Sequence, residues 1–180
     1  MTHPTIGLLD RYQDYRVRRW QVRDERLAGM LPRWRTRARR RALVITVVAS
    51  LFAMFATGVL SAFDLRWAPM VSLPAVLVFL PSWTMLRIAS QGHDHAPAQT
   101  LDEWEIAQRN TARSVGLTIT QALVIAPVFY LVYSGAIFPE ANAFQTAYAG
   151  GIMALAALLA GGCSPAMILG WTRPDPDQES

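Results

Sequence analysis

Few residues in this sequence are of types that could carry out chemistry. His93, Asp94 and His95 form the one cluster that resembles metal ligands, because two imidazoles around a carboxylate could bind zinc or copper if a third ligand joined them. A glycine before the cluster and a proline after it are also typical of a solvated turn. We therefore predict no metal site and no cofactor, with His93 and His95 as the only candidate ligands.

No catalytic set accompanies these histidines. Cys163 and Ser164 are nucleophile types, but no histidine lies near them in the sequence to act as a base. The long apolar runs contain no ionisable residue well inside them other than Cys163, whereas proton relays and ion-coupled pumps need such groups within the membrane. We predict no catalytic residue and no enzyme activity. A membrane-bound enzyme that acts on lipid is a further hypothesis, although the sequence offers no identifiable active site for it.

Four long apolar runs predict the helices on which these residues lie or between which they fall. The 180-residue chain is 52% hydrophobic and 17% charged. Residues 42–63, 67–86, 114–139 and 141–172 include no charged residue and no histidine. A helix needs about 20 mainly apolar residues to cross the hydrocarbon core. The sequence therefore predicts an all-α, polytopic membrane protein with four transmembrane helices, at about 42–63, 67–88, 114–138 and 144–170. It leaves no room for a large soluble catalytic domain.

The arginines indicate the orientation. All 17 basic residues are arginine, and twelve of them precede the first predicted span. Only Arg66 lies between the first two spans, and none lies between the last two. Because positive residues favour the cytoplasmic side, we predict that segments 1–41 and 173–180 and the loop 89–113 are cytoplasmic, with sixteen arginines inside and one outside.

Short links pair the spans into two antiparallel hairpins, joined by the longer loop 89–113. Asn142 is expected to cap the last helix. Each hairpin follows an acidic stretch, at 24–25 and 102–105, which is either a trace of an internal repeat or the usual preference for acids at a helix start.

The segment before the first span predicts a basic helix, from about residue 5 to residue 30. Pro32 ends it, and a collar of arginines follows beside the membrane: Arg33, Arg35, Arg37, Arg39, Arg40 and Arg41. Such clusters attract anionic lipid headgroups or a partner, although fixing the topology is an alternative role for the collar. No DNA-binding motif accompanies the charge, so nucleic-acid binding is not expected.

Small residues and prolines mark the spans. Small residues recur at about four-residue spacing and predict close helix packing, within the bundle or against another subunit. They are Ala49, Ala53 and Thr57 in the first span and Gly150, Gly151, Ala154 and Gly161 in the last. Prolines at 69, 74, 81, 127 and 165 predict kinks in the second to fourth spans.

The stretch from Leu101 to Ala107, which leads through Arg109 and Arg113 into a span, resembles small four-span membrane proteins of unknown function from high-GC actinobacteria. The resemblance implies a bacterial plasma membrane and supplies no catalytic residue. Small size, uncharged spans and small-residue faces favour an accessory or scaffold subunit that binds lipids and a membrane-protein partner, or forms a homo-oligomer. The alternative is a transporter or channel component, with a pathway between the kinked second, third and fourth helices.

Overall fold

The computed structural model describes Tyr15, Arg18, Trp34 and residues 36–65, 67–90, 103–137 and 142–172. Four helices form there: α2 (Arg37–Ala62), α3 (Ala68–Ala89), α4 (Glu103–Ile137) and α5 (Ala143–Thr172). Each of them is long and apolar enough to cross a membrane, and no strand occurs among the described residues. The predicted all-helical, four-span fold is confirmed. Of the expected N-terminal helix, only Tyr15 and Arg18 are described, and both are helical.

Two helices start earlier than the predicted spans. α2 begins at Arg37 and α4 at Glu103, whereas the apolar runs begin at residues 42 and 114. An apolar run marks the part of a helix that crosses lipid, but the helix continues wherever the residues before it favour helix. Residues 103–113 are rich in glutamate, alanine, glutamine and arginine, which are good helix formers. The second half of the predicted loop 89–113 is therefore helical.

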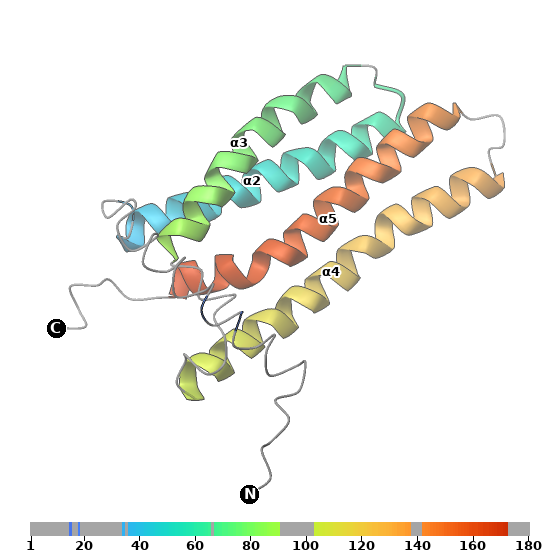
Figure 1. Cartoon of the computed structure of the whole chain (residues 1–180). Coiled ribbons are helices and arrows are strands. Elements are labelled where there is room, and N and C mark those ends of the chain that lie inside the picture. Colours follow the sequence, from blue (N-terminus) through green and yellow to red (C-terminus); the bar gives the residue numbers. More distant parts are fainter. Residues whose placement is uncertain are drawn as a thin grey trace, which may run out of the picture.

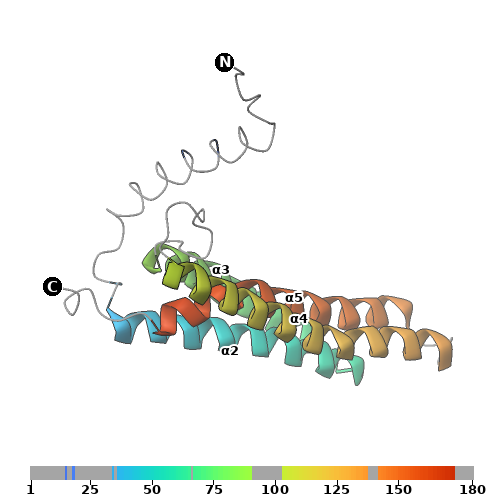
Figure 2. The same cartoon turned by 90° about the horizontal axis from the view of Figure 1, so that it is seen from below.

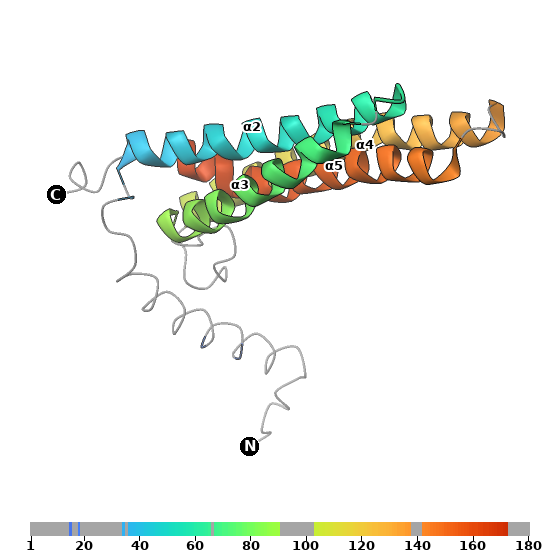
Figure 3. The same ribbon diagram turned by 90° about the horizontal axis from the view of Figure 1, so that it is seen from above.

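Successive helices run antiparallel, and they lie side by side in the order α3, α2, α5, α4 (Figure 1). α2 packs on both α3 and α5, while α4 packs mainly on α5. Views from below and above show the same arrangement (Figures 2 and 3). α3 and α4 therefore lie at opposite edges, and the two hairpins meet through α2 and α5.

Local polar contacts stabilise the turn between α2 and α3 and the start of α5, which lie at the end of the bundle opposite the start of α2. Asp64 takes the left-handed conformation, with φ 60°, and its N–H donates to the Ser61 carbonyl at 3.2 Å. Aspartate tolerates this conformation better than most residues. Asn142 caps α5, because its Oδ1 accepts from the N–H of Phe144 at 3.1 Å. The predicted cap is confirmed.

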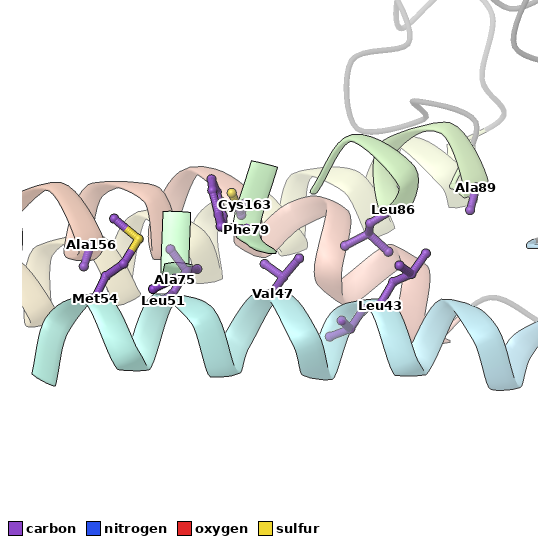
Figure 4. Close-up of a cluster of buried hydrophobic side chains, with 11 residues drawn as sticks. Leu43, Val47, Leu51, Met54, Ala75, Phe79, Leu86, Ala89, Ala156 and Cys163 are labelled. Atoms are coloured by element: carbon purple, nitrogen blue, oxygen red, sulfur yellow. The ribbon is translucent and has the colours of Figure 1, made fainter. Parts of the chain in front are cut away.

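The main apolar cluster joins α2, α3 and α5 (Figure 4). α2 contributes Leu43, Val47, Leu51 and Met54 from one face, at spacings of three and four residues. Ala75, Phe79, Leu86 and Ala89 come from α3, and Ala156 and Cys163 from α5. Lipid tails are as apolar as these side chains, so close packing between helices, more than removal from water, holds such a cluster together in a membrane.

Candidate functional site

α4 is held to α5 by a crossing of two glycines. A Cβ atom on Gly116 would lie 2.9 Å from the Gly161 carbonyl oxygen, and one on Gly161 would lie 3.0 Å from the Gly116 oxygen. The Thr120 hydroxyl donates to the Gly116 oxygen at 2.8 Å and also lies against Gly161. The two backbones therefore touch, and only glycine fits at either position.

Further contacts complete the packed face of α4. Leu131 packs on Gly150 of α5, and Pro127 is fully buried. Near the start of α4, the Gln108 amide donates to the Thr172 hydroxyl at 3.4 Å. One side of α4 is thus used along much of its length.

The opposite side of α4 has an exposed row of residues at alternating spacings of three and four. The row consists of Ser114, Thr118, Gln121, Ile125, Val128 and Val132, which we call the exposed face of α4. Its polar residues lie toward the start of the helix and its branched apolar residues toward the end. Alternating spacings of this kind form the seam along which two helices pack.

Gln121 is the amide on this face, and burial in the membrane would leave it without a hydrogen-bond partner. It lies sixteen residues before Ile137, which is about 24 Å at the helical rise and within the thickness of a hydrocarbon core of about 30 Å. Thr118 satisfies its own hydroxyl by donating to the Ser114 carbonyl at 3.1 Å. No such bond of the Gln121 amide occurs among the described residues, and an amide facing lipid without a partner is costly.

The predicted helix-packing residues are divided among three environments. Thr57, Gly150 and Gly161 are buried, and Ala53 and Ala154 are half-buried. Ala49 is exposed, and Gly151 has nothing within 4 Å of a Cβ position, so these two residues do not pack in this chain. A row at four-residue spacing turns by about 40° at each step, because a helix has 3.6 residues per turn, and it leaves the contact face.

Gly58 is a packing residue that the four-residue rows omitted. A Cβ atom on Gly58 would lie 2.9 Å from the Ala149 carbonyl oxygen and would also overlap the Met153 side chain. Gly58 is thus the point at which α2 approaches α5. The small residues of α2 that are buried are Ser50, Thr57, Gly58 and Ser61. Their spacings of seven, one and three differ from a regular four-residue repeat.

The arginine collar lies only partly toward solvent. Arg37 and Arg39 are exposed, but Arg40 is 3% exposed and therefore buried within the bundle end. The Arg41 guanidinium lies 4.7 Å from the centre of the Trp171 ring, so this arginine ties the start of α2 to the end of α5. Arg33, Arg35, His93 and His95 lie outside the described residues. Among the described residues, no cluster of three potential metal ligands occurs.

The prolines do not converge on one space. Pro74 and Pro81 are exposed on α3, Pro127 is buried in α4, and Pro165 is half-buried in α5. A pathway between these three helices would need them to enclose a common volume. With α3 and α4 at opposite edges, the arrangement does not favour such a pathway within one copy of the chain.

Comparisons with known proteins returned no family model, no curated protein and no solved structure that matches this chain. The resemblance to actinobacterial membrane proteins therefore stays a prediction.

Proposed function

We propose that this protein is an accessory or scaffold subunit of a bacterial membrane complex, without catalytic activity of its own. The observation that carries the proposal is Gln121 on the exposed face of α4, an amide at membrane depth with no partner among the described residues. A second protein helix on this face would supply the missing hydrogen bond. Lipid tails cannot supply it.

The shape of the face fits a helical partner. Ser114 and Thr118 are small enough to let another backbone come close to Gln121, while Ile125, Val128 and Val132 offer branched side chains for packing along the rest of the seam. Hydrogen bonds across membrane helices contribute about 0.6–2 kcal/mol each. The Gln121 amide would therefore fix where along α4 the partner helix binds, and side-chain packing would supply the rest of the binding free energy.

The proposed location is the plasma membrane, with both termini in the cytoplasm. Arg37, Arg39 and Arg87 lie at the same end of the bundle, where α2 begins and α3 ends, whereas Asp64 lies at the other end (Figure 1). The positive-inside rule supports a cytoplasmic arginine end. Exposed arginines there would also bind anionic headgroups, at about 1 kcal/mol per residue near the surface.

The test is affinity purification of the tagged full chain from its own membranes in a mild detergent. We expect a stoichiometric membrane-protein partner with the wild type, and a roughly 3- to 30-fold weaker association with Gln121→Leu, as 0.6–2 kcal/mol implies. Thr84→Val is the control, because Thr84 is an exposed polar residue on the opposite edge helix, and its hydroxyl donates to the Leu80 carbonyl at 2.8 Å.

Mass spectrometry distinguishes the outcomes. A different protein, or a second copy of this chain, would support docking through α4 if Gln121→Leu weakens it and Thr84→Val does not. A solitary monomer from gently solubilised membranes would contradict the proposal. So would a partner that is retained equally by both variants.

A further inference from the structure

A pocket of about 330 Å³ lies at the end of the bundle where α2 ends and α5 begins. Its walls include Ser61 from α2, Asp64 from the hairpin turn, and Phe144, Gln145 and Tyr148 from α5. This volume is at the lower end of the range for small-molecule pockets. The pocket is remote from the middle of α4 and therefore independent of the proposed partner face.

Ser61 gives the first sign of a ligand. It is 3% exposed, and its hydroxyl has no hydrogen-bond partner in the described structure. Other buried serines behave differently: Ser72 and Ser164 each donate to a carbonyl one turn earlier, at 2.7 Å. A buried hydroxyl without a partner is unfavourable, and a ligand in the pocket would satisfy it once the Ser61 side chain turns toward the pocket.

The polar walls are already fixed in place. The Gln145 amide donates to the Ser61 carbonyl at 2.8 Å, and the Tyr148 hydroxyl donates to the Ser72 hydroxyl at 2.9 Å. Asp64, in its left-handed turn conformation, is exposed and lines the pocket. A ligand would therefore meet groups held by the protein before it arrives, which lowers the entropic cost of binding.

We propose that this pocket binds a small organic ammonium group. Asp64 is the one charged side chain among the lining residues that the structure describes, and its carboxylate attracts a cation. Phe144 and Tyr148 add aromatic rings to the lining, which can make cation–π contacts, and the Ser61 hydroxyl can accept an N–H. An anion is disfavoured, because the first N–H groups of α5 already donate to the Asn142 side chain.

The ammonium group has two possible sources. Under the proposed orientation the pocket opens at the outer membrane surface, where it would meet either a soluble amine or the ethanolamine headgroup of a lipid. Both present the same primary ammonium to Asp64. The experiment therefore uses free ethanolamine as the probe, in nanodiscs with and without phosphatidylethanolamine.

Isothermal titration of the full chain in phosphatidylcholine nanodiscs should show saturable binding of ethanolamine. Asp64→Asn should weaken the binding at least tenfold, while Glu103→Gln, the same change of charge on an exposed residue at the opposite end, should leave it unchanged. Ser61→Ala should also weaken binding, yet leave the thermal stability of the free protein equal or higher, because it removes an unsatisfied buried hydroxyl.

Comparing nanodiscs with and without phosphatidylethanolamine identifies the source of the ammonium group. Loss of ethanolamine binding in nanodiscs that contain phosphatidylethanolamine would assign the pocket to the lipid headgroup, and unchanged binding would assign it to a soluble amine. Absence of saturable binding in both nanodiscs would overturn the proposal. Equal affinity of the wild type and Asp64→Asn would overturn it as well.

Discussion

Gly161→Ala should separate α4 from α5 and destabilise the folded chain. The new methyl group would lie 3.0 Å from the Gly116 carbonyl oxygen and would overlap the Thr120 side chain. Rotation can move the Thr120 hydroxyl away, but the Thr120 Cβ, at 2.6 Å, and the Gly116 oxygen are fixed to the backbone and cannot move without α4. Forcing an extra methyl group into a tight contact typically costs about 1–3 kcal/mol.

The neighbouring Gly162 provides a matched control, because a Cβ atom there would meet nothing within 4 Å. Gly162→Ala removes a flexible residue from the interior of α5, which stabilises a helix by about 0.5–1 kcal/mol. The two variants carry the same chemical change one residue apart. Both variants gain this helix stabilisation, so it cancels between them. We therefore expect Gly162→Ala to exceed Gly161→Ala in free energy of unfolding by the steric cost alone, roughly 1–3 kcal/mol, or about one to two powers of ten in equilibrium constant.

The assay is unfolding of each purified variant by sodium dodecyl sulfate in mixed micelles, followed by tryptophan fluorescence. A second substitution, Thr120→Ala in the Gly161→Ala background, should restore part of the loss, because it removes the overlapping hydroxyl, while the Cβ of residue 120 and the Gly116 oxygen stay in contact with the new methyl group. Equal unfolding midpoints for Gly161→Ala and Gly162→Ala would refute the reasoning. That result would mean that α4 and α5 do not cross at these glycines.

Three further perturbations follow from single contacts. Asn142→Ala should lower the free energy of unfolding by about 1 kcal/mol in the same assay, because the first N–H groups of α5 lose their acceptor, whereas Asn142→Asp should retain most of it. Met54→Ala should cost about 2–5 kcal/mol by opening a cavity at a site that is 1% exposed, and Met70→Ala, at 75% exposure, should shift the thermal midpoint little. Trp171→Ala should cost about 0.5–1 kcal/mol by removing the ring under Arg41, and limited trypsin digestion should then cut faster after Arg41.

The number and course of the spans could be predicted because lipid imposes a simple requirement. A charged residue inside the hydrocarbon core is costly, so four uncharged runs mark four crossings. The true starts of the helices are less visible, because helix continuation in water depends on weak propensities. α4 begins at Glu103, in a polar stretch whose sequence is equally compatible with a loop.

Which face of each helix packs could not be predicted, and the reason is physical. In a soluble protein the buried face is apolar and the exposed face polar, so periodicity reveals both. In a membrane both faces are apolar, and only steric fit separates them. Ala49 and Gly151, for example, are no larger than Thr57 and Gly150. They nevertheless lie on helix faces that do not contact another helix of this chain. The sequence shows that Gln121 is an amide within an uncharged run, but its outward position follows only from the packing of α4.

The uneven packing of α4 connects the fold to the proposed function. α2, α3 and α5 share an apolar cluster, whereas α4 is held mainly from one side, by a crossing that depends on Gly116 and Gly161. A partner on the exposed face would hold α4 from the other side. Binding at a hundred times the dissociation constant adds about 2.7 kcal/mol to the folded state. That gain is comparable to the expected loss in Gly161→Ala, so a true partner should rescue this variant in membranes even where detergent leaves it unfolded.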